Sequence, residues 1–353
     1  MNTMFDTLND SSHVFVIAEA GSNWKCGGYT EDLERAKKLI KIASNAGADA
    51  VKFQTFKPET IYVDYAGTSN YLSKSGVQDS INKIFKHLSM PYKMIPELKE
   101  YCNKQNIVFM STPFSIQDAK EVDPYVEIHK VASFEINHIR LLEFLAKTKK
   151  PIIISTGAST YDEIDFAIDL MKRNGNQNIS LLQCTSKYPC PIEALNLGAI
   201  SEMRNKYRLL PVGLSDHSLD PILAPIIAVS LGSKIIEKHF TLDKNLPGPD
   251  HLFSLNPEEL QVMIKYIRNA EKSFGSGKKE ILKEEEELRQ FATRSIQAIQ
   301  DIHKGELLKE GLNFDILRPG NRIRGLEARF LETLTGKKAI KDIQKGDGII
   351  DYE

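Results

Sequence analysis

Residues 14–55 read VFVIAEAGSNWKCGGYTEDLERAKKLIKIASNAGADAVKFQT, which is an apolar run, a longer polar segment and a second apolar run. Runs that are apolar throughout indicate strands buried on both faces. In the segment between them the apolar residues recur every three or four positions, which predicts an amphipathic helix. These residues are Leu33, Ala36, Leu39, Ile40, Ala43 and Ala46. The stretch therefore predicts a strand, a helix and a parallel strand joined by a right-handed crossover.

The same alternation continues along the chain. Further apolar runs are VFMSTPF (108–114), IHKVAS (128–133), PIIISTG (151–157), LLQCTS (181–186), LPVGLSD (210–216) and KIIEKHF (234–240). With the first two runs they form eight strand–helix units over about 260 residues, which is typical of a (β/α)₈ barrel, a TIM barrel of the α/β class. An open doubly wound sheet is the alternative, but EAGSNWKCGG (19–28) lacks the GxGxxG spacing of a dinucleotide site. We therefore expect a barrel domain at residues 1–275.

The composition changes after the barrel segment. The charged stretch GSGKKEILKEEEELRQ (275–290) predicts a linker or an exposed helix at 276–292. Two similar segments follow, AIQDIHKGELL (298–308) and AIKDIQKGDGI (339–349). Each predicts two short strands joined by a turn at Lys-Gly. Two copies are too few for a solenoid, so we expect a compact β-rich module at 293–353.

The charge balance disfavours several classes of partner. Lys and Arg number 46 against 47 Asp and Glu, so no overall field attracts nucleic acid or an anionic membrane surface. No apolar run approaches the roughly 18 residues of a membrane span, and the first ten residues lack a leader pattern, so we expect a cytoplasmic protein. The cysteines, Cys26, Cys102, Cys184 and Cys190, form no CxxC pair and predict reduced thiols rather than disulfides or a zinc site.

Polar residues gather where the predicted strands end, and in a barrel this is the face that carries active sites. Two lysines and four hydroxyl residues on five different strands share this position. They are Lys52, Thr112, Lys130, Ser133, Ser155 and Ser215. Ammonium groups neutralise phosphate and carboxylate, and hydroxyls add oriented hydrogen bonds in a partly dry cleft. One such residue is usually an ordinary strand end, but the agreement across five strands predicts an anion site.

Two histidines end adjacent predicted strands, His217 after VGLSD and His239 within KIIEKHF. Because strands seven and eight are neighbours in a barrel, both imidazoles are expected within reach of one divalent ion. Imidazole suits Mn²⁺, Fe²⁺, Co²⁺ or Zn²⁺ better than Ca²⁺, and two protein ligands leave positions for water and substrate oxygen. Glu237 faces the same side of its strand as His239. A lone histidine is more often a hydrogen-bonded rim residue, so the metal hypothesis rests on the pair.

The chain carries a series of longer motifs in a fixed order. They are IAEAGSNW (17–24), VKFQT (51–55), STPFS (111–115), KVASFEI (130–136), ISTGAS (154–159), CTSKYPCP (184–191), GLSDHS (213–218), EKHFTLDKNLPGPDH (237–251) and LRPGN (317–321). This series closely resembles the sialic acid synthase family, whose members make nine-carbon 2-keto sugar acids. LRPGN matches the C-terminal antifreeze-like module, or SAF domain, of these enzymes. The resemblance spans nearly the whole chain and implies a TIM barrel followed by a SAF domain.

The resemblance also implies an activity. In the family, phosphoenolpyruvate condenses with an open-chain N-acylated amino sugar such as N-acetylmannosamine, and phosphate leaves by C–O cleavage. The reaction uses a divalent metal, so we expect Mn²⁺, with Mg²⁺ or Co²⁺ as alternatives. Family members are homodimers in which the SAF domain of one subunit covers the active site of the other, and we expect the same domain-swapped dimer here.

Individual roles follow from the same resemblance. The phosphoenolpyruvate site would comprise Lys52, Thr112, Lys130, Ser133, Ser155, Ser186 and Ser215. Glu19, His217 and His239 would be catalytic, with the two histidines as metal ligands. The sugar site would comprise Gln54, Glu135, Tyr188, Glu237 and Asp250, together with Arg318, which would reach across the dimer to the N-acyl group.

Two departures from the family pattern bear on the acceptor. Asn23 and Trp24 stand where many relatives have Asn-His, which leaves the shape of the first loop open. The segment ASFEI (132–136) resembles the pseudaminic acid synthase branch, so a pseudaminic or legionaminic acid synthase with a 2,4-diacetamido-trideoxyhexose acceptor is an alternative. A synthase for a phosphorylated acceptor and a non-catalytic carbohydrate-binding protein are further alternatives. We expect loop residues 60–80 to select the acceptor.

Overall fold

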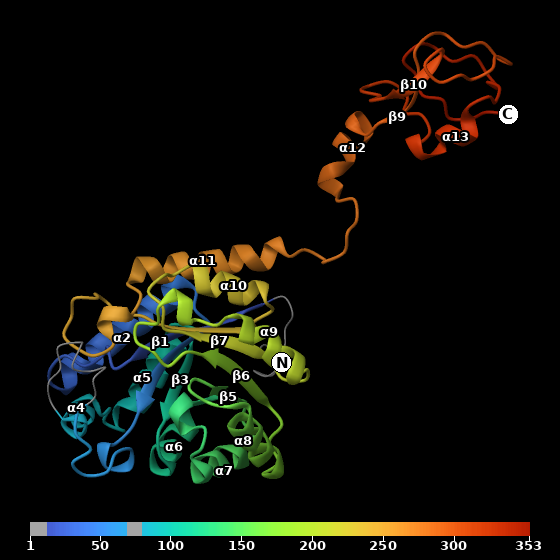
Figure 1. Ribbon diagram of the computed structural model, residues 1–353. Coiled ribbons are helices and arrows are strands. Elements are labelled where there is room, and N and C mark those ends of the chain that lie inside the picture. Colours follow the sequence, from blue (N-terminus) through green and yellow to red (C-terminus); the bar gives the residue numbers. More distant parts are fainter. Residues whose placement is uncertain (1–12, 69–79) are drawn as a thin grey trace. The chain divides into compact units, whose positions relative to one another are not determined.

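The computed structural model describes residues 13–68 and 80–353. The chain divides into two compact units, Met1–Gly275 and Ser276–Glu353, and each has a hydrophobic core of its own (Figure 1). Residues 69–79, which form part of the loop expected to select the acceptor, lie outside the described residues.

Parallel strands form the centre of the first unit. In its described part, eight strands hydrogen-bond in the order β3-β2-β1-β8-β7-β6-β5-β4, and β3 and β4 at the two ends of this order also lie against each other. The strands are β1 (Phe15–Gly21), β2 (Ala50–Thr55), β3 (Val108–Pro113), β4 (His129–Val131), β5 (Ile152–Ser155), β6 (Ile179–Cys184), β7 (Val212–Asp216) and β8 (Ile235–His239). The sheet therefore curls into the (β/α)₈ barrel that the eight apolar runs predict.

Each strand is followed by helical structure on the outside of the barrel (Figure 1). The α-helices are α2 (Tyr29–Ala46), α4 (Ile81–Leu88), α5 (Met94–Lys104), α6 (Ile116–Val122), α7 (Ile139–Lys147), α8 (Tyr161–Arg173), α9 (Gly198–Lys206), α10 (Leu223–Ser230) and α11 (Pro257–Ser273). Short 3₁₀ turns are η1 (Pro58–Thr60), η2 (Asp123–Tyr125), η3 (Ser133–Glu135), η4 (Ile192–Ala194) and η5 (His251–Phe253). No helix in the described ranges is both long enough and apolar enough to span a bilayer.

Local sequence explains where these helices begin and end. Thr160 starts α8 with a capping box, in which its side chain accepts from the Glu163 N–H and the Glu163 carboxylate accepts from the Thr160 N–H. Helix α2 ends at Gly47, whose φ of 87° lies in the left-handed region that favours glycine. The apolar stripe predicted for α2 is buried against the strands, from Leu33 to Ala43.

Two apolar layers support the barrel mouth. The larger lies between the strands and the helices and includes Trp24, which is only 1% exposed. The smaller fills the barrel interior and comprises Phe15, Ile17, Ala50, Met110, Ile128, Ile153, Leu182 and Ile235. The interior is thus packed below the mouth, and polar side chains can line the carboxyl ends of the strands without weakening this core.

The second unit begins with η6 (Lys283–Glu285) and α12 (Glu286–Ala292), which occupy the predicted linker, and continues with β9 (Ser295–Ala298), β10 (Phe314–Leu317), η7 (Ala328–Phe330) and α13 (Leu331–Leu334). Strands β9 and β10 pair antiparallel. The two similar segments also pair with each other, since Ile302 and Ile343 exchange both backbone hydrogen bonds. Asp301 accepts from the backbone N–H of Lys345, and Asp342 accepts from that of Lys304. The repeat therefore forms a reciprocal pairing in which isolated bridges replace the short strands expected.

Candidate active site

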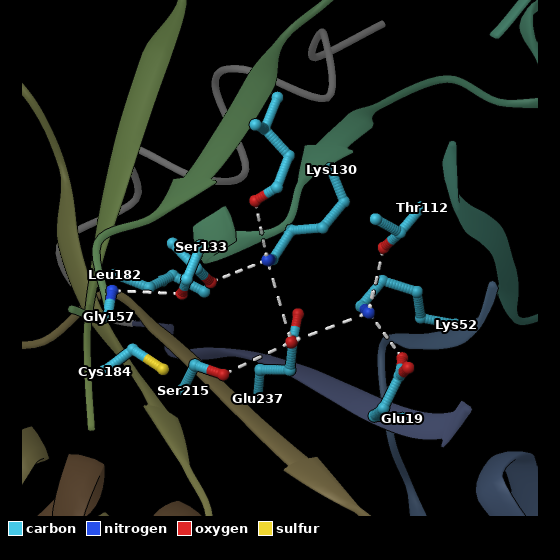
Figure 2. Close-up of polar contacts among 12 residues, drawn as sticks. Glu19, Lys52, Thr112, Lys130, Ser133, Gly157, Leu182, Cys184, Ser215 and Glu237 are labelled. Atoms are coloured by element: carbon cyan, nitrogen blue, oxygen red, sulfur yellow. Dashed lines mark hydrogen bonds and ion pairs between the residues drawn. The ribbon is translucent and has the colours of Figure 1, made fainter. Parts of the chain in front are cut away.

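The first lysine of the predicted anion site, Lys52, belongs to β2, and its ammonium contacts side chains of β1 and β3 (Figure 2). Lys52 Nζ lies 2.5 Å from Glu19 Oε2 and donates to Thr112 Oγ1 at 3.1 Å. Gln54 Nε2 donates to Glu19 Oε1 at 3.0 Å. Glu19, Lys52 and Thr112 are all buried. The structure therefore brings together four residues that the sequence places at the ends of three strands.

The second lysine lies across the mouth, on β4. Lys130 Nζ donates to Ser155 Oγ at 2.6 Å and to the Val131 carbonyl at 3.1 Å. Nearby, Ser133 Oγ accepts from the Gly157 N–H at 3.0 Å. Gly157 was not predicted as a site residue, but a Cβ there would lie 2.9 Å from Ser133 Oγ and 2.3 Å from Ser186 Oγ. Only glycine fits this position without displacing the two serines.

Glu237 on β8 connects the two lysines (Figure 2). Its Oε1 lies 3.6 Å from Lys52 Nζ and 3.8 Å from Lys130 Nζ, and it accepts from Ser215 Oγ at 3.3 Å. Its Oε2 is buried and has no hydrogen-bond partner in the described part of the chain, and the same is true of Ser186 Oγ. Buried polar atoms are rarely left unpaired in native proteins. These two atoms are therefore available to an incoming molecule.

Burial shapes the electrostatics of the mouth. It raises the pKa of Glu19 to about 7, although Lys52 opposes the shift. Burial alone would lower the pKa of Lys52, but the adjacent Glu19 and Glu237 outweigh it, and the net shift is upward. For Lys130, burial prevails and lowers the pKa despite Glu237. Near neutral pH, Glu19 is thus close to its midpoint and can exchange a proton.

The two histidines lie side by side at the ends of β7 and β8. The centroids of the His217 and His239 rings are 5.6 Å apart. His217 Nδ1 lies 3.0 Å from the Thr185 carbonyl, and a carbonyl only accepts, so Nδ1 carries the proton and Nε2 keeps its lone pair. The rings of Tyr188 and Phe253 pack against His217, with centroids 4.2 Å and 6.4 Å away. Phe253 was not predicted, because nothing in the sequence relates η5 to the histidines.

The first loop meets the segment that follows β8. Asp250 accepts from the backbone N–H of Ser22 at 3.2 Å and from its hydroxyl at 2.9 Å. Asn23 Nδ2 donates to the Phe240 carbonyl at 2.8 Å, and Trp24 packs into the outer core. Gly21 has a φ of 49°, and a Cβ there would lie 2.8 Å from Asp250 Oδ2. These contacts define the loop shape that Asn23 and Trp24 left open.

The two remaining predicted residues are Glu135 and Arg318. Glu135 is half-buried in η3, and its pKa is raised to about 7 by burial and by the nearby Asp118 carboxylate. Arg318 is exposed in the second unit, directly after β10. The other predicted site residues belong to the mouth of the barrel.

The chain belongs to the NeuB family, whose model matches residues 39–279. It is similar to the spore coat polysaccharide biosynthesis protein SpsE of Bacillus subtilis, with 38% identity over 98% of this chain and 94% of that protein. The crystal structure of that protein superposes with a TM-score of 0.64 over 96% of this chain and 94% of the other.

Two further relatives come from Campylobacter jejuni. Its pseudaminic acid synthase is 38% identical over 97% of each chain. Its N,N'-diacetyllegionaminic acid synthase is 39% identical over 94% of this chain and 97% of that protein. The similarity therefore includes both the barrel and the second unit.

Proposed function

We propose that this chain is a transferase that condenses phosphoenolpyruvate with an open-chain N-acylated amino sugar, forming a carbon–carbon bond and releasing phosphate. The observation that carries the proposal is the pair of buried lysines, Lys52 and Lys130, each hydrogen-bonded to a hydroxyl at the barrel mouth. Phosphoenolpyruvate carries a phosphate and a carboxylate, and two separated ammonium groups match this pair of anions. Membership of the NeuB family and similarity to sugar acid synthases support the assignment.

The lysines are already paired in the free protein, and this determines how the donor binds. Glu237 Oε1 lies between Lys52 and Lys130, and Glu19 contacts Lys52. With both carboxylates ionised, the charges of these four residues cancel. A highly anionic donor therefore competes with Glu237 for the ammonium groups, and its charge must be offset by protons or a cation. Ser133, Ser155, Ser186 and Ser215 would supply its remaining hydrogen bonds.

The reaction we propose has two bond-forming steps. C3 of phosphoenolpyruvate attacks the sugar aldehyde carbon with the electrons of its double bond, and the aldehyde oxygen takes up a proton. Water adds at C2 and loses a proton. The resulting tetrahedral carbon expels phosphate together with the former bridging oxygen, its hydroxyl gives up its proton, and C2 becomes a ketone. Glu19 is the carboxylate suited to move these protons, because it is buried, contacts Lys52 and has a pKa of about 7.

The two imidazoles fit a divalent cation. In its neutral form His217 would offer the lone pair of Nε2, and His239 Nδ1 is buried without a hydrogen-bond partner in the described residues. No cluster of three or more His, Cys, Asp or Glu side chains within 13–68 and 80–353 is arranged to hold an ion, so water or substrate would complete the coordination. We propose Mn²⁺, with Mg²⁺ or Co²⁺ as alternatives. When bound, it polarises a carbonyl oxygen and stabilises the charge that develops there.

The second unit has a proposed role in the same reaction. Its LRPGN segment resembles that of SAF modules, and we propose that it serves the active site of the partner in a domain-swapped homodimer. Arg318, an exposed residue of this segment, would contact the N-acyl carbonyl of the sugar. A guanidinium donates with a fixed planar geometry that lysine reproduces poorly.

The acceptor we favour is a 2,4-diacetamido-trideoxyhexose. The ASFEI segment at 132–136 and the names of the two Campylobacter relatives support it. The test is a panel of N-acetylmannosamine, 2,4-diacetamido-trideoxyhexoses and 6-phosphorylated amino sugars, assayed for phosphate release from phosphoenolpyruvate with Mn²⁺. Release with unphosphorylated acceptors, abolished by EDTA and restored by Mn²⁺, is expected. Preference for a phosphorylated acceptor would favour the alternative synthase, and sugar binding without phosphate release would favour a carbohydrate-binding protein.

A pair of lysine variants tests whether the mouth is the donor site. Lys130→Met should reduce kcat/KM for phosphoenolpyruvate at least 100-fold, because it removes charge-assisted hydrogen bonds worth about 1.5–3 kcal/mol each. Lys147→Met changes an exposed lysine at the end of α7 and should leave kcat/KM unchanged. Equal activity of the two variants would refute the site.

A further inference from the structure

A buried ion pair lies directly behind the two histidines. Lys238 and Asp216 are each 1% exposed, and the Lys238 ammonium donates to the Asp216 carboxylate. The two residues face each other across β7 and β8 in the strand register. Side chains alternate along a strand, so Asp216 and Lys238 point away from the mouth into which His217 and His239 point. The pair therefore contacts neither substrate nor the proposed ion.

Ser218 completes this network and connects it to His217. Its backbone N–H donates to Asp216 Oδ1 at 2.8 Å and its hydroxyl to Oδ2 at 3.0 Å. Lys238 Nζ donates to the Ser218 carbonyl at 2.6 Å and lies 3.2 Å from its hydroxyl. Asp216 and Ser218, which flank His217, are thus both hydrogen-bonded to the ammonium group of Lys238, which directly precedes His239.

The rest of the His217 backbone is also held. Its carbonyl accepts from the Cys190 N–H at 2.8 Å, and its ring is oriented by the Thr185 carbonyl. The β7 end is therefore fixed on one side by β6 and the segment after it, and on the other by Lys238. No comparable side-chain bond to His239 Nδ1 exists in the described residues, so the position of His239 relative to His217 depends on the strand pairing and on this network.

Stability alone does not account for such a network. A buried ion pair gains little over well-packed apolar residues of similar size, because desolvation offsets the Coulomb attraction. A directional network does fix geometry, and metal ligands must lie within a few tenths of an ångström of their preferred distances. Residues that orient metal ligands from behind typically change metal affinity 10- to 100-fold when they are replaced.

We propose that Asp216, Ser218 and Lys238 form a positioning lock that sets the spacing and angle of His217 and His239 and thereby the affinity for a divalent cation. The inference rests on the proposed metal site. It assigns these three residues a role in ligand geometry rather than in chemistry.

The test uses the full-length protein and Mn²⁺ alone as the probe. The double variant Asp216→Asn/Lys238→Met removes both charges together, so neither is left unpaired. We expect it to remain folded by circular dichroism, with a Kd for Mn²⁺, measured by calorimetry and by electron paramagnetic resonance, raised 10- to 100-fold. Its Kd for phosphoenolpyruvate in the absence of metal should stay within about twofold of wild type, a split that general destabilisation would not produce.

A matched control removes another ion pair from the same barrel. Asp123 and Lys150 precede β4 and β5 and so lie at the opposite end of the strands, with Lys150 Nζ 2.8 Å from Asp123 Oδ1. Asp123→Asn/Lys150→Met should leave the Kd for Mn²⁺ unchanged. If the first double variant does not fold, Ser218→Ala, which removes the hydroxyl hydrogen bond to Asp216 and leaves the ion pair intact, decides the question with an expected loss of about tenfold.

Wild-type Mn²⁺ affinity in the folded Asp216→Asn/Lys238→Met variant, or in Ser218→Ala where that variant is needed, would overturn the lock while leaving the metal site intact. Absence of Mn²⁺ binding by the wild-type chain would overturn the metal site, and the lock with it. Either result is distinguishable from a failure of the proposed donor site, which the phosphoenolpyruvate Kd reports separately.

Discussion

Replacing Lys52 and Lys130 one at a time with methionine should have opposite effects on stability, although both lysines are equally buried. Lys52 lies 2.5 Å from Glu19, which is 1% exposed and keeps only Gln54 as a side-chain partner when the ammonium is removed. Breaking a buried pair in this way costs about 3–5 kcal/mol. For a unit of this size the loss corresponds to a Tm lower by about 10 °C.

Lys130 differs because its nearest carboxylate oxygen, on Glu237, is 3.8 Å away and burial lowers its pKa. Burying the charged form of Lys130 therefore costs desolvation free energy, and replacement by methionine removes this cost. Lys130→Met should leave Tm unchanged or raise it by a few degrees, while the Kd for phosphoenolpyruvate rises about 100-fold. Calorimetric Tm and titration of each variant with phosphoenolpyruvate provide both readouts.

The Lys52 effect should also depend on pH. Burial raises the folded-state pKa of Glu19 to about 7, so its contribution to stability is present at low pH and is lost as pH rises toward that value. Without Lys52 the pKa rises further, and the loss extends to higher pH. The destabilisation by Lys52→Met should therefore be larger at pH 8 than at pH 6. Equal Tm values for the two methionine variants at pH 8 would refute this account of the mouth.

Three further outcomes are expected. Hydrogen bonds from His129 and then Lys150 lower the pKa of Asp123 to about 2, although burial opposes the shift. The resulting contribution to stability, about 1 kcal/mol, should persist above pH 4, fade between pH 4 and 2, and be absent in thermal melts of Asp123→Asn. In Gly157→Ala the added Cβ meets serine hydroxyls that can rotate away, so the change should mainly raise the KM for phosphoenolpyruvate. In Gly213→Ala the added Cβ would lie 2.3 Å from the backbone carbonyl oxygen of Ile235, which cannot move, so a thermal melt should show that the barrel unfolds. Mixing Glu19→Gln subunits with Arg318→Ala subunits should restore activity if the dimer is domain-swapped. In the mixed dimer one active site then carries both substitutions and the other carries neither. If mass analysis confirms subunit exchange and the mixture stays inactive, the swap is contradicted.

The barrel could be predicted because each strand–helix unit has a recognisable pattern in its own stretch of sequence. Apolar runs such as that at 14–21 alternate with helical periodicity, and residues at strand ends, such as Lys52 and Lys130, meet at one face of any parallel barrel. The hydroxyl partners Thr112 and Ser155 followed from the same rule. Polarity at the ends of successive strands was sufficient to find them.

Other parts of the site depend on packing that sequence patterns do not show. Glu237 bridges both lysines only because closure of the barrel brings β8 between β1 and β7. Gly157 is needed because the space beside it is filled by Ser133 and Ser186, which follow β4 and β6. Phe253 reaches the histidines through a loop whose path is determined by tertiary contacts. The role proposed for Arg318 would require a second subunit, which no local pattern describes.

The measurement that tests the central proposal most directly follows the bridging oxygen of phosphoenolpyruvate. The donor is labelled with ¹⁸O between C2 and phosphorus and turned over with Mn²⁺ and the preferred acceptor of the panel, and phosphate and sugar acid are analysed by mass spectrometry. Cleavage at C2–O after water addition predicts that the label leaves in phosphate and that the new 2-keto group is unlabelled. Label retained in the sugar acid, with unlabelled phosphate, would show P–O cleavage and contradict the account.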